Sequence, residues 1–313
     1  MNERTRIQIE EMKKQTIGVE VEMYNITREK AIRTIATYFH TEDTVTYIGG
    51  GYSAWTCKDN KGRKWVMTRD SSIRAAHDDE KAELGTPILT YEDIPQLQEV
   101  IRQLRHKGAK SDPSHMCGVH IHVGLNGHTP KSLRNLANIM AGHESLLISA
   151  MRLDRRRINS YCRTVDPDFL SRLNRRKPRT MEQFADIWYA NHEYESRNAH
   201  YNNSRYRMLN YHACFTHKTI EFRCFQFADE GNGRKGGLHA GELKSYIQLC
   251  LSLSQMAKTA ASASPQEPQH ENPKYAMRTW LLRLGFIGEE FETARDILTK
   301  NLAGDTAFRH GRA

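Results

Sequence analysis

The stretch QTIGVEVEMYN, residues 15–25, decides how the rest of this 313-residue chain is interpreted. Apolar and polar residues alternate along it, which is the pattern of a β-strand with one buried face. Its polar face carries Glu20 and Glu22, and side chains two residues apart in a strand point the same way, about 6.5–7 Å apart. Carboxylates gathered on a buried face are costly unless cations neutralise them. The stretch therefore predicts a strand that presents acidic ligands from one face of a sheet.

Two later strands repeat this feature. CGVHIHV, residues 117–123, carries His120 and His122, and TIEFRCF, residues 219–225, carries Glu221 and Arg223. Glu83, from KAELGTP at residues 81–87, is expected on the same face. Oxygen ligands of this kind suit Mg²⁺ or Mn²⁺, and such metals would in turn hold a triphosphate. Arg223 and a histidine would add positive charge there.

Each pair alone has a simpler interpretation. E-x-E is common on a solvated strand face, and E-x-R is often a cross-strand ion pair. H-x-H also fits zinc hydrolases and cupin-like oxidases. The occurrence of all three on apolar strands favours one shared site over three unrelated surface features.

The remaining periodicity predicts a chain of mixed strands and helices. We expect strands at residues 15–25, 47–55, 63–68, 81–85 and 116–124, with a turn at 59–62, and a hairpin of strands 207–214 and 219–227. Helices are expected at residues 27–39, 93–107, 129–151 and 238–258, followed by two short helices at 275–284 and 289–302.

Composition narrows the class of partner. The formal net charge of +9 indicates an anionic partner, which can be nucleic acid, nucleotide phosphates or an acidic substrate. No apolar run reaches the ~18 residues of a membrane span, and the charged N-terminus lacks a signal peptide, so we expect a cytoplasmic protein with no membrane partner. The six cysteines form no C-x-x-C pair and are predicted to be buried, reduced thiols.

Further short motifs lie between the three polar strands. They are KWVMTRDSSI (64–73), AELGTPIL (82–89), RRINSYC (156–162) and RYRMLN (205–210). In this order, the whole series over residues 16–258 resembles the amidoligase family, relatives of glutamine synthetase and of glutamate–cysteine ligase. The resemblance implies an α+β fold with a glutamine synthetase-like catalytic domain, in which helices back a curved, mainly antiparallel β-sheet.

The resemblance covers residues 16–258, and composition and periodicity predict how the chain is organised around that part. Residues 1–260 would be the catalytic domain, residues 261–274 a linker rich in Pro, Gln and Ser, and residues 275–313 a helical appendage. An arginine-rich helical insertion at 152–207 would form a lid that selects an acidic molecule or acidic peptide. A solvated basic face is the alternative, and arginines interleaved with aromatic residues also fit a nucleic-acid binder.

The resemblance also implies a role for each motif residue. The implied metal ligands are Glu20, Glu22, Glu83, His120 and Glu221. Glu83 would also lie near the transferred phosphate, His122 would touch the nucleotide phosphates, and Arg223 would stabilise the transferring phosphoryl group. Arg207 and Asn210 would line the nucleotide or substrate pocket, or serve the hairpin structurally. Asp70 would accept a proton from the amine, or cap the turn at Ser72.

These roles imply an ATP- and Mg²⁺-dependent ligase. It would join a carboxylate to an amine through an acyl phosphate and so form an amide bond. One alternative is a metal-dependent hydrolase that uses His120, His122 and the carboxylates, and another is a basic protein that binds nucleic acid. The polar strand pairs favour the ligase over nucleic-acid binding. The sequence specifies neither the two substrates nor the oligomeric state.

Overall fold

A computed structural model describes residues 3–228, 237–268 and 271–307 of the chain. The chain forms two compact units. The first comprises residues 1–15, 123–224 and 245–313, and the second comprises residues 16–122 and 225–244. The predicted boundaries of catalytic domain, linker and appendage stay a prediction. Residues 1–2, 229–236, 269–270 and 308–313 of those segments lie outside the described residues.

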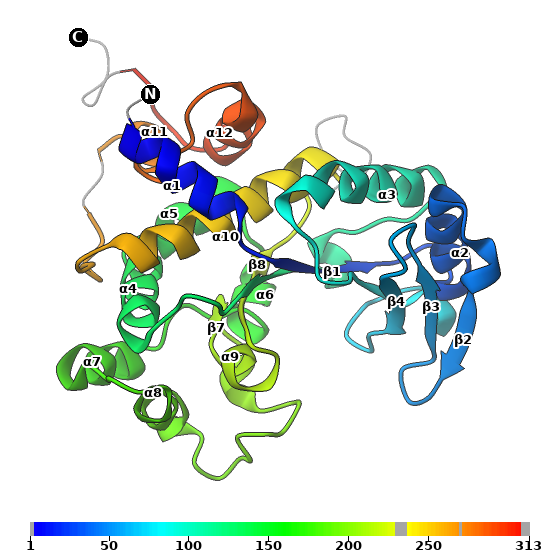
Figure 1. The fold of residues 1–313 in the computed structure, drawn as a ribbon, viewed down its shortest axis with the longest axis horizontal. Helices are drawn as coiled ribbons and strands as arrows, with labels where there is room; N and C mark the ends of the chain where they lie inside the picture. The colour runs from blue at the N-terminus through cyan, green and yellow to red at the C-terminus, as the bar shows by residue number, and fades with distance from the viewer. Residues whose placement is uncertain (1–2, 229–236, 269–270, 308–313) are drawn as a thin grey trace. The chain divides into compact units, whose positions relative to one another are not determined.

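The second unit is built on a sheet with strand order β2-β3-β4-β5-β1-β6 (Figure 1). Its pairs β2–β3, β3–β4, β4–β5 and β5–β1 are antiparallel, as predicted. The strands are β1 Ile17–Met23, β2 Thr46–Gly49, β3 Ala54–Lys58, β4 Lys64–Arg69, β5 Ala82–Gly85 and β6 Val119–Gly124. The helices are α2 Arg28–Phe39 and α3 Ile94–His106, with 3-10 turns at Glu42–Thr44, Asp78–Glu80, Tyr91–Asp93 and Pro113–His115.

Helix α2 backs one face of this sheet. Thr27 caps its N-terminus by accepting a hydrogen bond from the Lys30 amide, so the helix begins where the sequence predicted. Its buried residues recur every three or four positions, and the Phe39 ring lies 5.4 Å from that of Trp65 in β4. Helix α3 packs beside α2 with its own buried stripe (Figure 1). The sheet is therefore backed by helices, as the sequence predicted.

The register places the acidic residues on the opposite face. Glu22 is paired with Glu83, and Glu83 is paired with Thr68, so these three side chains lie on one face in a row across β1, β5 and β4. Trp65 is three positions before Thr68 in β4, and side chains alternate between faces. Trp65 and α2 therefore lie on the back of the sheet, and the carboxylates lie on its front.

The predicted strand at residues 47–55 is wrong in one respect. It is broken into β2 and β3 by a turn in which Gly49 and Gly50 have φ values of 74° and 73°. Only glycine adopts this left-handed backbone readily, so the chain turns back at the glycines instead of continuing as one strand. The predicted turn at 59–62 is confirmed, since Lys58 is paired with Lys64 across it.

The first unit is mainly helical. Its elements are α1 Glu3–Lys13, α4 Pro130–Ala141, α5 Glu144–Met151, α6 Arg155–Ser160, α7 Pro167–Arg176, α8 Met181–Trp188, β7 Leu209–Asn210, α9 His212–Thr216, β8 Thr219–Phe225, α11 Pro273–Arg283 and α12 Glu292–Thr299. Helix α10, Ala240–Thr259, begins in the second unit and continues into the first. Further 3-10 turns are Tyr189–Asn191, Asn203–Arg205 and Glu289–Phe291. The predicted helical character of the arginine-rich segment holds through α6, α7 and α8 but not after Trp188, where the described residues of the segment have only 3-10 turns, and its role as an insertion stays a prediction.

Three expectations for this unit need correction. The helix predicted at 129–151 is two helices, α4 and α5, which are separated by Gly142 and His143. The chain around Gln266 packs closely on this break, since a Cβ on Gly142 would lie only 3.1 Å from the Gln266 carbonyl. The strand predicted at 207–214 is much shorter, since only β7, Leu209–Asn210, forms. The Asn210 side chain accepts a hydrogen bond from the His212 amide at 2.8 Å, and helix α9 begins at His212 in place of the strand. Helix α1 was not predicted, since its charged sequence buries only Met12.

The cysteines and the helix lengths agree with the sequence. All six cysteines are free and buried, as predicted. Within the described part of the chain, no helix has the length and apolar character that crossing a membrane requires.

Candidate metal centre

Carboxylates from three strands of the second unit meet on the front of its sheet. One oxygen each from Glu22, Asp70 and Glu83 lies within 4.8 Å of the others. Glu22 comes from β1 and Glu83 from β5, while Asp70 follows the last residue of β4. The antiparallel register causes this meeting, because Glu22 and Glu83 are direct cross-strand partners. The structure therefore brings together three oxygen donors that are separated by up to 61 positions in the sequence.

Hydrogen bonds hold two of these carboxylates in place. Glu22 is 5% exposed and accepts from the Gly118 amide at 2.6 Å. Asp70 accepts from the Ser72 amide at 2.7 Å, which confirms the turn-capping bond that the sequence suggested as one of its two roles. The cap occupies Oδ1 of Asp70, and the predicted role of Asp70 as proton acceptor stays a prediction.

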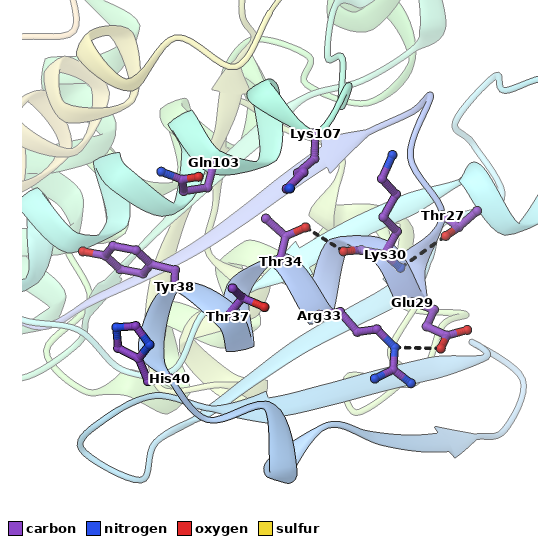
Figure 2. A pocket seen from close by; sticks show the side chains of 10 residues that line it. All are labelled: Thr27, Glu29, Lys30, Arg33, Thr34, Thr37, Tyr38, His40, Gln103 and Lys107. Atoms are coloured by element: carbon purple, nitrogen blue, oxygen red, sulfur yellow. Dashed lines mark hydrogen bonds and ion pairs between the residues drawn. The ribbon is translucent and has the colours of Figure 1, made fainter.

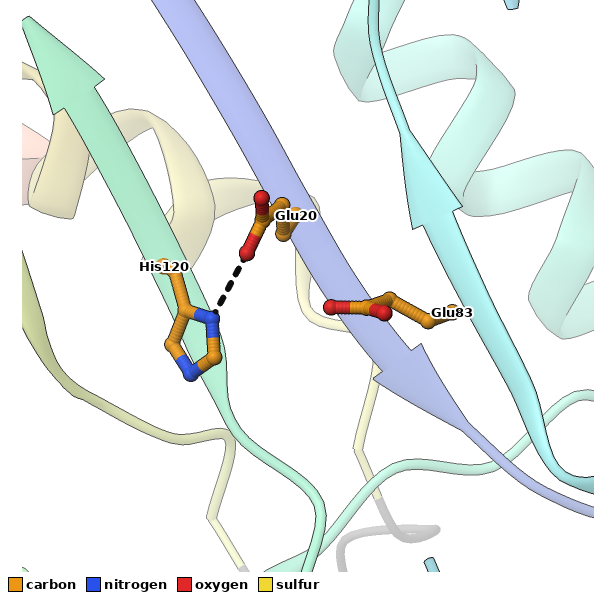
Figure 3. Close-up of side chains that lie close together, drawn as sticks. All are labelled: Glu20, Glu83 and His120. Atoms are coloured by element: carbon orange, nitrogen blue, oxygen red, sulfur yellow. Dashed lines mark hydrogen bonds and ion pairs between the residues drawn. The ribbon is translucent and has the colours of Figure 1, made fainter. Parts of the chain in front are cut away.

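A second group overlaps the first. Glu20, Glu83 and His120 each place a ligand atom within 4.8 Å of the others. Figure 3 shows Glu20 on β1 between the other two, with His120 on β6 on one side and Glu83 on β5 on the other. Nδ1 of His120 lies 2.9 Å from Oε2 of Glu20, and Nε2 of His120 lies 3.6 Å from Oε1 of Glu22. One imidazole therefore contacts both acidic residues of β1.

His122 completes this network within the second unit. Its Nε2 lies 3.3 Å from Oε1 of Glu20, so Glu20 is held between two imidazoles. Burial favours the neutral form of the Glu20 carboxyl, but His122 and His120 together hold its pKa well below the usual range. Glu20 is therefore ionised at neutral pH, which is the state that a cation ligand requires.

Two glycines support the site, and the sequence analysis missed both. A Cβ on Gly18 would lie 3.3 Å from the Cβ of His122, so a larger residue at Gly18 would press on that imidazole. Gly118 supplies the amide that binds Glu22. A signal for Gly18 was present, because a glycine inside a strand pattern often marks a close approach of neighbouring chains.

Three of the remaining predicted residues meet in the first unit. Asn210 of β7 is paired with Glu221 of β8, and its Nδ2 donates to Oε2 of Glu221 at 2.6 Å. Arg223 forms an ion pair with the other oxygen of Glu221. All three side chains are at least 95% buried, so this is a rigid, neutralised group. Their convergence with the acidic residues of β1 and β5 stays a prediction.

Arg207 is held elsewhere in the first unit. Its Nη2 donates to Asp166 at 2.8 Å, and its Nη1 donates to the Thr164 carbonyl at 3.0 Å. Asp166 caps α7, so these bonds tie the segment before β7 to the arginine-rich helices. These bonds are structural but do not involve the hairpin that the sequence suggested, and the role of Arg207 in the nucleotide or substrate pocket stays a prediction.

The donor atoms of the two groups are mostly carboxylate oxygens. Glu22, Asp70 and Glu83 offer only oxygen, which suits Mg²⁺ or Mn²⁺ better than a softer ion. The group of Glu20, Glu83 and His120 adds a single nitrogen. Three acidic groups in this space also repel one another, and a divalent cation would relieve that repulsion. The residues therefore fit hard divalent cations.

A family model described as "Putative amidoligase enzyme" matches residues 13–254. Among solved structures, the chain is similar to the crystal structure of a bifunctional glutathione synthetase from Pasteurella multocida, with 12% sequence identity and a TM-score of 0.47. That match covers 96% of this chain and 49% of the other, so this chain spans about half of its length. A search of curated proteins gave no match.

Proposed function

Because this chain belongs to the amidoligase family, whose model matches residues 13–254, we propose that it joins a carboxylate to an amine with ATP and Mg²⁺. The observation that carries the proposal is the oxygen-rich group of Glu22, Asp70 and Glu83 on one face of an antiparallel sheet. We further propose that the fold is glutamine synthetase-like. The buried thiols fit a reducing compartment, so we place the protein in the cytoplasm.

The proposed reaction has two steps. A carboxylate oxygen of the first substrate attacks the γ-phosphorus of ATP, the bond to the bridging oxygen breaks, and ADP leaves. The nitrogen of the amine then attacks the acyl carbon of the acyl phosphate, and phosphate leaves with the electrons of the broken C–O bond. The nitrogen gives up a proton to complete the amide. Phosphoryl transfer of this kind depends chiefly on positioning and charge neutralisation.

The residues of the second unit would bind the cations and the nucleotide. Glu20, Glu22, Glu83 and His120 would hold Mg²⁺, which supplies positive charge next to the phosphates. Asp70 lies in the same group, so it is a further metal ligand in this proposal as well as the proton acceptor suggested by the sequence. His122 would contact the phosphates while Glu20 keeps its ring in place.

The residues of the first unit have complementary roles in the proposal. Glu221 would complete a metal site, and Arg223 would stabilise the transferring phosphoryl group. Asn210 would position Glu221 through its bond of 2.6 Å, and Arg207 would keep the arginine-rich segment in place for an acidic substrate. An acidic peptide is one candidate for the carboxylate substrate.

Binding of Mg·ADP to the full chain tests the proposal. Isothermal titration should detect binding to the wild-type chain and none to Glu20→Gln, because the substitution removes a ligand charge from a partly exposed position. Glu42→Gln, at an exposed position outside the site, is the matched control and should bind like the wild type. A wild-type chain that binds no Mg nucleotide would refute the ligase. Tightly bound zinc with turnover that needs no nucleotide would instead support the hydrolase.

A further inference from the structure

A groove of about 780 Å³ lies along helix α2 in the second unit, with α3 contributing to its wall (Figure 2). Its lining extends from Thr27, the N-cap of α2, to His40, the C-cap. A helix of this length spans about 18 Å. The groove is therefore too long for one small anion, and it matches about five residues of extended chain at ~3.3 Å each.

The groove carries positive charge that the described residues do not neutralise. Lys30 of α2 and Lys107, the residue that follows α3, both line it, and neither ammonium group has an acidic partner in the described part of the chain. Figure 2 shows Lys107 above Thr34, with Lys30 extending from α2 beside it. Arg33 pairs with Glu29 at 2.8 Å, so the one carboxylate of the lining is already compensated. The groove is thus complementary to a ligand with several negative charges.

The uncharged part of the lining suits a peptide. Thr34, Thr37 and Tyr38 line the groove between the charges and carry no formal charge themselves. Burial, with the nearby charge of Glu99, raises the pKa of Tyr38, so its hydroxyl keeps its proton at neutral pH and can donate a hydrogen bond. The ammonium groups of Lys30 and Lys107 each offer three donors and no acceptor, which favours carboxylates.

The groove belongs to the back of the sheet and not to the metal centre. Helix α2 packs against Trp65 on the back, whereas Glu22 and Glu83 lie on the front. The groove is on the outer side of α2, where residues such as Lys30 and Arg33 are not buried by the sheet. A ligand in the groove is therefore separated from the carboxylates by the thickness of the sheet and one helix.

We propose that this groove is a docking site for an extended acidic peptide segment, carried by the substrate that the metal centre modifies. The inference rests on the proposed function only for the statement that the peptide belongs to a substrate. Docking away from the centre would raise the local concentration of the reacting group. It would also give the enzyme selectivity that a bare carboxylate cannot supply.

The test is the binding of a fluorescein-labelled, glutamate-rich peptide of about ten residues, followed by anisotropy at low salt on the full chain. The double variant Lys30→Glu/Lys107→Glu should weaken binding by at least about tenfold, because two attractive contacts become repulsive. The matched control is Lys58→Glu/Lys131→Glu, which makes the same change in net charge at two exposed positions outside the groove. It should stay within about twofold of the wild type. Circular dichroism and thermal melting establish that both variants are folded.

The outcomes separate this inference from the proposed function. If peptide binding weakens equally in both double variants, the docking site is refuted, because attraction to the net charge of the protein alone would explain the binding. Stronger displacement of the peptide by single-stranded DNA than by unlabelled peptide would overturn it in favour of nucleic acid. If the wild-type chain binds no Mg·ADP but binds the peptide, and the Lys30→Glu/Lys107→Glu variant loses the peptide, the proposed function fails and the docking site stands.

Discussion

Replacement of Glu83 by glutamine tests the metal centre through stability as well as activity. Glu83 takes part in both cation groups, with Glu22 and Asp70 in one and with Glu20 and His120 in the other. Glu83→Gln keeps the shape of the side chain and removes one negative charge. Without metal, the variant should be more stable than the wild type, because fewer like charges repel. With metal, the order should reverse, since a ligand is missing.

The size of the effect follows from the geometry. Two unit charges 4.8 Å apart repel by about 3 kcal/mol at an effective dielectric constant near 20. Glu83 and Asp70 are partly exposed, and solvent screening reduces this to about 1 kcal/mol for each pair. Glu20 is already paired with His120 and His122, so the pairs that count are those with Glu22 and Asp70, and their removal should raise the melting temperature in EDTA by roughly 2–4 °C. The affinity for Mg²⁺ should fall by at least about tenfold, in line with the loss of one ligand charge.

Thermal melting in EDTA and across a Mg²⁺ titration measures both effects. Glu42→Gln, an exposed position outside the site, is the control for a lost surface charge and should match the wild type in both conditions. A lower melting temperature for Glu83→Gln in EDTA, together with an unchanged response to Mg²⁺, would refute the reasoning. Glu83 would then be a structural residue that is bonded to its neighbours and not a ligand that repels them.

Two further predictions concern stability in the two units. Burial raises the pKa of Glu144 to about 7, so the folded chain holds this proton more tightly than the unfolded chain. The free energy of unfolding should therefore fall by up to about 3 kcal/mol as the pH rises from 4.5 to 7. Glu144→Gln, which still accepts from the Val165 amide, should remove this pH dependence in urea unfolding at pH 5 and 8. Asp93 is 2% exposed and pairs with Arg63 at 2.6 Å and Lys61 at 2.7 Å. Because Arg63 keeps its pair with Asp59 and Lys61 is half exposed, Asp93→Ala should cost about 1–3 kcal/mol, and a loss below about 0.5 kcal/mol in urea unfolding would show that the network contributes little.

Local sequence signals predicted most elements but not their interruptions. Period-two and helical patterns located β1, α2, α3 and β6 because those elements bury one continuous face. The break between β2 and β3 and the break at Gly142 were missed. In both places the apolar pattern continues across glycines, so the pattern alone does not show the break. The break depends on the left-handed backbone at Gly49 and Gly50 in one place and on the close packing at Gly142 in the other. Helix α9 was missed because one bond, from the His212 amide to Asn210, redirects a strand-like sequence.

The sequence by itself determined which side chains share a strand face. Glu20 with Glu22 and His120 with His122 follow from the period of two alone, since no other part of the chain can alter it. It also led to the hypothesis of a cation site, because three polar pairs on apolar strands favour one shared site over three unrelated surface features.

Only the tertiary structure decided which strands are neighbours and in what register. The pairing of Glu22 with Glu83, the position of Asp70 beside both, and the contact of His120 with Glu20 depend on backbone hydrogen bonds between segments far apart in the chain. A shift of one residue in the β1–β5 register would place Glu83 on the opposite face from Glu22. Glu22, Asp70 and Glu83 would then no longer lie close together. Packing of the apolar back of the sheet against α2 selects the register, and that selection involves residues that no local pattern connects.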